Sequence, residues 1–525
     1  MKKIWNIQAD GRSLDNSEII STIFECRGID DIDHFLRPNE KDLIPYEKLY
    51  NIDKAYNIIS DGIDDNKSFW IVADVDVDGC TSGAIIYRYL YNFTHNINIS
   101  INQGKEHGIN DFDIKNCTAD IVIIVDSINE NECYQKFINA NKQVIVLDHH
   151  IIPDNFRTDV VLVSSANNYE NPELSGAGVV WKFCKYFDYM TLNDYADNLV
   201  DLTTCGLIAD MVNVTTPENR YICSEGFKNI HNKGIQKVNG SYKFDSQSVS
   251  FGLAHMVNAA QRMNLNEKAL QLFLTDDENE IKTLIKTLKN AKEEQNEIVS
   301  SLMQGIIEQA ESQIDNKVMF FVIDTNASIS GLIGNKLISI YQRPIIVLKE
   351  TDEGYAGSAR GFGIDDFKFV VDSTELAWTG GHENAFGISI DRSNFRPFKE
   401  EINEILADFE FEVKQEADIQ LNLLQITNEL IDSFKTINLI SGTGFKPLTV
   451  MVSDIVNYKV GNMSGGKHLK IVTDDITLIK WNFNGDWDEF DGRPISVIGG
   501  LNSSFFGRTF TKQIIIDDYI VKDGD

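Results

Sequence analysis

The stretch FWIVADVDVDG, residues 69–79, joins an apolar run to three aspartates. Its first five residues are continuously apolar, a pattern typical of a strand buried on both faces of a parallel sheet. Asp74, Asp76 and Asp78 follow where this strand is expected to end. Ligands of open α/β sheets bind beyond the carboxyl ends of the strands. The stretch therefore predicts an α/β fold with a carboxylate-bearing site at one sheet edge.

Two later apolar runs end in the same way. The run IVIIV stops at Asp126, and the run VIVL stops at the triplet Asp148, His149 and His150. Because the carboxyl ends of neighbouring parallel strands meet at one sheet edge, at least five carboxylates and two imidazoles are expected to gather there.

So many acidic groups in one place predict bound cations. Like charges that are packed together and removed from water are costly unless cations neutralise them. Carboxylate oxygens with one or two imidazoles suit Mn²⁺ or Mg²⁺, and no cysteine stands beside the histidine pair to favour a thiolate zinc site. Two such ions are the usual means of cleaving a phosphate ester. For any single aspartate, the alternative of a helix-capping residue stays open.

The spacing of these residues resembles a known family. The pattern Asp74-x-Asp76-x-Asp78-Gly, the single Asp126 and the Asp-His-His triplet resemble the first three motifs of the DHH phosphoesterases, with flanks similar to the RecJ branch of single-strand exonucleases. Asp210, near the end of an amphipathic helix predicted over residues 194–212, resembles the fourth motif.

The resemblance implies a role for each of these residues. Two divalent ions, Mn²⁺ or Mg²⁺, are expected to be held by Asp74, Asp76, Asp78, Asp126, His149 and Asp210. The expected catalytic residues are Asp148, His149 and His150, with His150 contacting the scissile phosphate. The expected substrate-binding residues are Arg262, Ser358, Arg360, Gly381 and His382.

The chain departs from the family pattern at three places. Asp126 is followed by Ser-Ile, where the family usually has a polar residue and glycine, and Gln261 replaces a family glycine. Residues 106–110 (EHGIN) resemble a family turn with one residue missing. His107 in this turn is expected to be an exposed loop histidine without a catalytic role.

The length of 525 residues is too great for one core and predicts several domains. A capping box at Thr275 and Glu278 predicts the start of a long helix, and five short strands beyond residue 440 predict a small barrel. The expected fold is two α/β lobes joined by a long helix, plus a C-terminal OB-like β-barrel. The predicted parts are a helical N-terminal part (1–67), the DHH catalytic domain (68–265), a connector helix (266–315), a DHH-associated substrate-binding domain (316–395), a helical linker (396–439) and an OB-fold-like domain (440–525).

The predicted barrel offers aromatic and basic side chains to a single strand. Most aromatic residues of such a barrel belong to its core, so only one or two are expected to stack on bases. The candidates are Phe483, Trp487, Phe505, Phe506, Lys467, Lys470 and Arg508.

The amino-acid composition indicates the charge, redox environment and cellular location to expect. The chain has 79 acidic and 48 basic residues, a net charge of −31, which repels nucleic acid at long range. A nuclease of this composition must confine its basic residues to a groove or rely on metal ions. Seven cysteines without a C-x-x-C pair favour free thiols in a reducing cytoplasm. No signal peptide or membrane span is predicted, so a cytoplasmic protein without membrane contact is expected.

The resemblance implies a metal-dependent exonuclease that hydrolyses single-stranded DNA, 5′ to 3′, to mononucleotides in DNA repair, recombination or replication. One alternative is a DHH phosphodiesterase that acts on short oligonucleotides or cyclic dinucleotides. Another is a non-catalytic replication scaffold. The expected partners are single-stranded DNA and a single-strand-binding protein or helicase.

Overall fold

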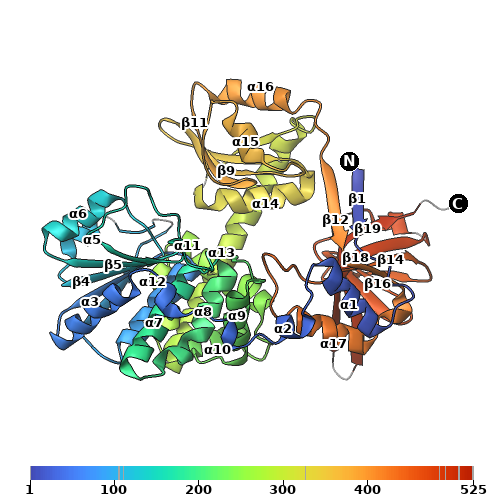
Figure 1. Cartoon of the computed structure of the whole chain (residues 1–525). Coiled ribbons are helices and arrows are strands. Elements are labelled where there is room, and N and C mark those ends of the chain that lie inside the picture. The colour runs from blue at the N-terminus through green and yellow to red at the C-terminus, as the bar shows by residue number, and fades with distance from the viewer. Residues whose placement is uncertain are drawn as a thin grey trace. The chain divides into compact units, whose positions relative to one another are not determined.

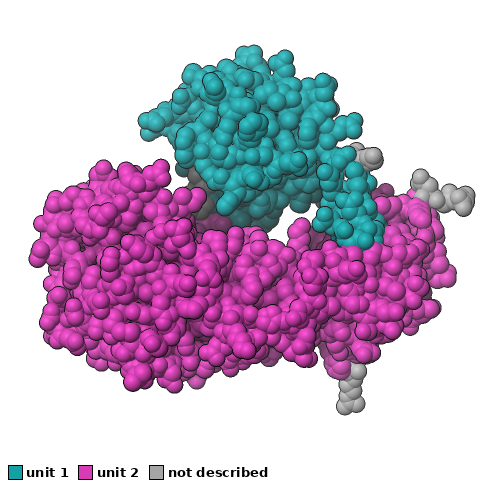
Figure 2. Space-filling view, viewed as in Figure 1, with its two compact units in different colours: residues 1–8, 293–417 teal, residues 9–292, 418–525 magenta. Residues whose placement is uncertain are grey.

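A computed structural model of the chain describes residues 2–104, 107–109, 111–324, 327–483, 485–490, 492–506 and 509–522. The chain folds into two compact units, and each unit is built from separate stretches of sequence (Figure 2). The smaller unit comprises residues 1–8 and 293–417, and the larger unit comprises residues 9–292 and 418–525.

A five-stranded parallel sheet lies in the larger unit (Figure 1). Val122 and Ile123 of its central strand belong to different hydrophobic clusters, so both faces of the sheet are buried, as the unbroken apolar runs predict. The α/β fold class expected from the sequence is confirmed. The strand order is β3-β2-β4-β5-β6, with β2 Phe69–Ala73, β3 Ile97–Ile101, β4 Ile121–Val125, β5 Gln143–Asp148 and β6 Val161–Ser164.

The register of this sheet aligns the strand ends that carry the acidic residues. Ala73 of β2 pairs with Val125 of β4, and Val125 pairs with Leu147 of β5. The next residue on each of these strands is an aspartate. The three aspartates that leave the sheet in one row are therefore Asp74, Asp126 and Asp148.

Helices cover this sheet (Figure 1). The helix predicted as amphipathic over residues 194–212 is shorter, and residues 200–208 are buried throughout, because this helix packs against three others. The π-helix η4 (Ser248–Ala254) leads directly into α11. The bounds are α1 Asn16–Cys26, α2 Ile32–Leu36, α3 Ile52–Asp64, α4 Val77–Leu90, α5 Asp111–Asn116, α6 Asn131–Asn139, α7 Gly176–Thr191, α8 Val200–Ala209, α9 Pro217–Lys228, α10 Lys233–Asn239, α11 His255–Arg262 and α12 Asn266–Leu274, with 3₁₀ turns at Glu40–Asp42, Tyr46–Lys48 and Tyr195–Leu199.

The long helix α13 spans Glu278–Glu311, 34 residues, and runs from the larger unit into the smaller one. A long helix here was predicted, but its capping residue is Asp277 and not Thr275. The Asp277 carboxylate accepts the backbone N–H groups of Asn279 (3.0 Å) and Glu280 (2.7 Å). In the described part of the chain, no helix combines the length and the apolar character that crossing a membrane requires.

The smaller unit has a mixed five-stranded sheet of order β10-β11-β9-β8-β7. Only β7 and β8 pair in parallel. Residues 2–7, within the part predicted as helical, form the strand β1 and pair with β12. The bounds are β1 Lys2–Ile7, β7 Met319–Val322, α14 Ser330–Tyr341, β8 Ile345–Glu350, β9 Gly354–Arg360, α15 Phe367–Asp372, β10 Trp378–His382, β11 Ala385–Asp391, α16 Phe395–Ile405 and β12 Glu412–Ala417, with a 3₁₀ turn at Ala327–Ile329.

The C-terminal strands form the barrel expected from the sequence. β14 and β15 are halves of one bent strand, because only residues 456–458 separate them. β14 pairs with β18 and β15 pairs with β16, so this bent strand closes the sheet of order β13-β14-β18-β19-β17-β16-β15. The bounds are β13 Ile419–Leu421, α17 Asn428–Ile437, β14 Val450–Ile455, β15 Lys459–Met463, β16 His468–Val472, β17 Ile476–Lys480, β18 Ile495–Phe506 and β19 Thr509–Val521, with 3₁₀ turns at Leu423–Gln425 and Trp487–Phe490.

The close packing of α8 against α4 and α7 generates a stability prediction. A Cβ atom added at Gly206 lies 2.5 Å from the Cβ of Ala177 and also meets the Asp78 carboxylate. We expect Gly206→Ala to lower the free energy of unfolding by about 1–3 kcal/mol through overpacking. Chemical denaturation in EDTA, followed by far-UV circular dichroism, measures this loss.

Gly305→Ala is the matched control for this substitution. Gly305 lies on α13, and a Cβ atom there meets no heavy atom within 4 Å. This variant should gain up to about 1 kcal/mol, because alanine has the higher helix propensity. Equal stability of Gly206→Ala and the wild type would contradict the packing described here.

Candidate metal centre

Three buried aspartates form the base of the candidate metal centre. The exposed fractions of Asp74, Asp126 and Asp148 are 4%, 2% and 0%. Asp74 and Asp126 follow β2 and β4, and Asp148 is the last residue of β5, so all three lie at one level of the parallel sheet. Ionised carboxylates in such surroundings need strong compensating interactions.

Two more aspartates come from the first turns of α4. Asp76 is the N-cap of this helix and accepts the backbone N–H of Gly79 at 3.0 Å. The capping interpretation is therefore correct for Asp76, although capping uses only one of its oxygens. Asp78 points instead to the start of α7, where it accepts the Ser175 hydroxyl at 2.9 Å and the N–H groups of Gly176 (2.7 Å) and Ala177 (3.0 Å).

A buried polar network anchors the loop that leads to Ser175. Glu218 of α9 accepts hydrogen bonds from the Asn171 amide at 3.1 Å and from the Lys182 ammonium at 2.6 Å. Both Lys182 and Glu218 are about 1% exposed. The sequence analysis did not single out this pair, because nothing in the local sequence connects α7 with α9.

Asp126 has an unusual backbone and an orphan oxygen. Its φ angle is +59°, in the left-handed region that aspartate tolerates better than most residues. Its buried Oδ1 atom makes no hydrogen bond with the described residues. Gly176 is needed beside it, since a Cβ atom there lies 2.5 Å from Asp126 Oδ1. A buried anionic oxygen without a donor fits a bound cation.

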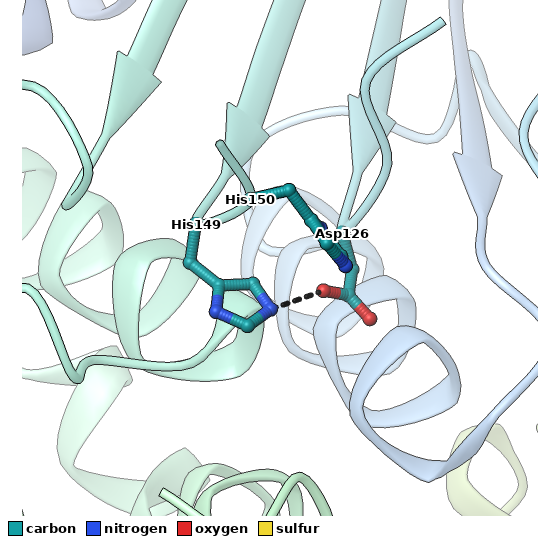
Figure 3. Close-up of side chains that lie close together, drawn as sticks. All are labelled: Asp126, His149 and His150. Atoms are coloured by element: carbon teal, nitrogen blue, oxygen red, sulfur yellow. Dashed lines mark ion pairs between the residues drawn. The ribbon is translucent and has the colours of Figure 1, made fainter. Parts of the chain in front are cut away.

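His149 lies among three carboxylates. Its Nε2 atom is 3.3 Å from Asp126 Oδ1, 3.7 Å from Asp210 Oδ2 and 3.9 Å from Asp78 Oδ2. Figure 3 shows its ring directed at Asp126. Asp210 is the C-cap residue of α8, so this helix delivers its carboxylate to the same place.

His150 is held by Asp148. The Asp148 carboxylate accepts the His150 backbone N–H at 3.1 Å and lies 2.9 Å from its Nδ1 atom. This hydrogen bond raises the pKa of His150 to about 9, so the ring is cationic at neutral pH. Asp148 therefore acts by orienting and charging His150.

Burial and mutual repulsion raise the pKa values of the other carboxyl groups. Burial, followed by the charge of Asp78, raises the pKa of Asp76 to about 6 and that of Asp210 to about 8. The same two causes raise the pKa of Asp126 well above its usual value. These three carboxyl groups therefore hold their protons more tightly than usual. A nearby positive charge, such as a metal ion, would favour their ionised form.

The donor atoms present fit divalent cations. Three sets offer ligand atoms within 4.8 Å of one another: Asp74, Asp76 and Asp126; Asp78, His149 and Asp210; and Asp126, His149 and His150. Each set holds carboxylate oxygens, and two include imidazole nitrogens, which suits Mn²⁺ or Mg²⁺. Asp126 and His149 each belong to two of the sets, so the sets adjoin one another.

His107 is the residue that the sequence analysis underestimated. Its side chain is 61% exposed, as expected for a loop histidine, but its Nδ1 atom lies 2.8 Å from Asp74 Oδ2. This hydrogen bond raises the pKa of His107. The signal available in the sequence was its place shortly after a strand of the same sheet. Glu106 and Asn110 of the same turn lie outside the described residues.

The structure places four of the sequence-predicted substrate residues on one sheet of the smaller unit. His382 of β10 pairs with Ala385 of β11, which pairs with Arg360 of β9, so His382 and Arg360 lie in one row. Ser358 precedes Arg360 by two residues and shares its face. The Arg360 guanidinium donates to Asn335 at 2.9 Å, and Gly381 has a φ angle of +130°.

The fifth residue of that set, Arg262, lies at the end of α11 in the larger unit. One guanidinium nitrogen donates to the Asn258 carbonyl at 2.9 Å. Its Nε atom is buried and makes no hydrogen bond with the described residues.

Exposure divides the aromatic candidates of the barrel. Phe483 is buried and packs on Trp487 at 4.8 Å, whereas Phe505 is 71% exposed. Arg508 and the side chain of Phe506 lie outside the described residues.

Residues 68–207 match the family model described as the DHH family, N-terminal domain. Over 457 residues, the chain is 29% identical to a putative SPbeta prophage-derived single-strand DNA-specific exonuclease of Bacillus subtilis, covering 79% of both chains. It is 25% identical to the single-stranded-DNA-specific exonuclease RecJ of Bacillus subtilis, covering 96% of this chain and 68% of that one.

The fold is similar to that of RecJ from Thermus thermophilus in complex with Mn²⁺. The TM-score is 0.80 at 20% identity, over 99% of this chain and 80% of that one. A structure of the same protein with Mg²⁺ gives a TM-score of 0.75 over 99% of this chain and 79% of that one, again at 20% identity. The resemblance to a DHH protein of the RecJ type is confirmed.

The raised pKa values predict how the metal-free protein responds to pH. For Asp76 and Asp210 the folded-state pKa lies above the usual 3.8, so their contribution to stability is present below pH 4 and is lost as pH rises through about 6 and about 8. His150 acts in the same direction, between about pH 6.5 and about 9. In EDTA the melting temperature should therefore fall between pH 5 and pH 9.

Added Mn²⁺ should reverse this fall, with a larger stabilisation at pH 8 than at pH 5. Asp210→Asn is the matched variant, because it removes one of the titrating groups and should flatten the curve in EDTA. A melting temperature that rises from pH 5 to pH 8 in EDTA would contradict the raised pKa values of these carboxyl groups.

Proposed function

Residues 68–207 match the DHH family, N-terminal domain, and from this match we propose that the chain is a metal-dependent exonuclease that hydrolyses single-stranded DNA to mononucleotides, with 5′ to 3′ polarity. The observation that carries the proposal is the convergence of Asp78, His149 and Asp210 with the aspartate row. The relatives named single-strand DNA-specific exonucleases support the choice of substrate.

In the proposed site Asp74, Asp76, Asp78, Asp126, His149 and Asp210 would hold two Mn²⁺ or Mg²⁺ ions. When bound, such ions lower the pKa of water and stabilise negative charge on a phosphate group. The chain itself supplies the positioning. Ser175, Gly176 and Ala177 fix the direction of the Asp78 carboxylate by donating three hydrogen bonds to it.

His150 is proposed to contact the scissile phosphate. As a cation held by Asp148, it can donate from Nε2 to a phosphate oxygen and stabilise the charge that develops there. Asp148, His149 and His150 are thus the proposed catalytic group, with Asp148 acting as a positioning residue through His150.

Substrate binding is assigned to basic and polar groups. Arg262 is proposed to bind a phosphate, since its Nε atom has no hydrogen-bond partner among the described residues. In the smaller unit, the row of Arg360 and His382, with Ser358 and the backbone of Gly381, is proposed to hold the terminal nucleotide.

Replacement of His150 tests the catalytic assignment. His150→Gln should lower turnover of single-stranded DNA by about 10²–10³-fold, because a neutral amide cannot supply the charge of the imidazolium. The control is His34→Gln, since His34 makes a similar contact with Asp42 (2.8 Å) away from the site. Turnover is measured with a 5′-labelled strand in Mn²⁺. Full activity of His150→Gln would refute the assignment.

A second candidate function is hydrolysis of short oligonucleotides or cyclic dinucleotides. The C-terminal barrel argues against it, because a dinucleotide needs no extended grip. We therefore expect faster turnover of a long single strand than of a dinucleotide, with products released from the 5′ end and no activity in chelator. Preference for the dinucleotide would favour the second candidate.

The remaining alternative, a non-catalytic scaffold, requires lost metal ligands, but every expected ligand position holds a donor. We also propose a cytoplasmic setting and a partner of the single-strand-binding or helicase type. The net charge of −31 supports an acidic outer surface that a basic partner could bind. Gel filtration with such proteins at low salt tests this, and separate elution would contradict it.

A further inference from the structure

An exposed aromatic pair lies on the helix that ends at Arg262. Phe251 is 66% exposed, and its ring contacts that of His255 at 5.6 Å in an edge-on arrangement. His255 is exposed as well. Phe251 belongs to the π-helix η4 just before α11, a distortion that is often found at functional sites.

Cationic groups surround this pair in a strongly acidic chain. His255 and Arg262 are seven residues apart on one continuous helix, so they share a face. Burial lowers the pKa of His255, and the charges of Lys292 and Arg262 lower it further, which places both cations within electrostatic reach. Lys292 comes from α13. The combination of an exposed ring with two cations matches the sugar, base and phosphate chemistry of a single strand.

Hydrogen bonds connect the start of α12, which follows this helix, with the segment after β3. Asn266, four residues beyond Arg262, donates to the carbonyl groups of Asn102 (2.7 Å) and Gly104 (2.9 Å). These residues follow β3 and lead to the turn in which His107 contacts Asp74. The end of α11 is therefore fixed beside the acidic edge of the sheet. From there back to Phe251, eleven residues of helix cover about 16 Å.

We propose that Phe251 and His255 form a base-stacking platform for single-stranded DNA, with Lys292 binding a phosphate next to the stacked base and Arg262 binding a phosphate nearer the end of the strand. The platform holds an internal base of the strand while its end lies at the metal centre. This inference rests on the proposed exonuclease function and adds a subsite to it. Its distance from Arg262 puts it beyond the reach of a dinucleotide, so it selects for longer strands.

The test is a binding scan in Ca²⁺ with oligonucleotides that carry one abasic position, moved stepwise along the strand. Wild-type protein should show one internal position at which loss of the base weakens binding about tenfold. In Phe251→Ala, loss of the base at that position should no longer weaken binding, and the intact strand should bind about tenfold more weakly than it binds the wild type. Phe251→Trp should restore both. An unchanged loss of binding at that position in Phe251→Ala would overturn the proposal.

Salt dependence separates the two kinds of contact. Lys292→Gln should reduce the slope of log binding constant against log salt concentration by about one, whereas Phe251→Ala should leave that slope unchanged. Tyr189→Ala is the control, because Tyr189 is an exposed aromatic residue (58%) on another helix of the same unit. An equal loss of binding in Tyr189→Ala would show a nonspecific effect and overturn the proposal.

Turnover distinguishes failure of the platform from failure of the proposed function. Phe251→Ala should lower the ratio of long-strand to dinucleotide turnover by about tenfold. If wild-type protein hydrolyses single strands and this ratio does not change, the platform alone is wrong. If wild-type protein hydrolyses no DNA with Mn²⁺ or Mg²⁺, the proposed function is wrong.

Discussion

The repulsion between carboxylates at aligned strand ends is the constraint on which this structure depends. The register of the parallel sheet puts Asp74, Asp126 and Asp148 in one row, and α4 adds two more acidic residues. Without compensation such an arrangement opposes folding. Three features compensate for this repulsion. Asp78 accepts hydrogen bonds from backbone N–H groups, and Asp148 contacts a cationic imidazole. One oxygen of Asp126 makes no hydrogen bond with the described residues and is free to bind a cation.

The parts of this centre that sequence could predict are those with a local pattern. Unbroken apolar runs predict buried parallel strands, and an aspartate directly after each run predicts the acidic edge. The histidine pair follows the third run directly and was predicted from that position, whereas Asp210 was reached through a family motif. The sequence could not show which of these residues face a metal ion and which orient another side chain. Asp148 bonds His150, for example, and belongs to none of the three sets of metal-ligand atoms.

Other features depend on contacts between residues far apart in the chain. Asp78 and Ser175 are 97 residues apart in the sequence. No local pattern therefore reveals that the Asp78 carboxylate accepts hydrogen bonds from the start of α7, the helix that Ser175 caps. The burial of α8 on all sides follows from three neighbouring helices, not from its own periodicity. Asp277 replaced Thr275 as the helix cap because two overlapping capping patterns compete there, and geometry decides between them.

Some of the cations of this chain, whose net charge is −31, are committed to internal contacts. Lys182 and Arg220 are buried in the larger unit, and Arg27 is paired with Asp418. These residues hold the core together and offer little to a ligand.

The larger unit is completed by a part of the chain that is synthesised late. Arg220 lies against the rings of Phe35 and Phe445, so an aromatic core unites segments on both sides of the inserted unit. Residues 293–417 separate these segments. At the ~5–20 residues per second of translation, the apolar surface of the early segment waits about 6–25 seconds for its partner. During that interval this apolar surface is exposed to aggregation.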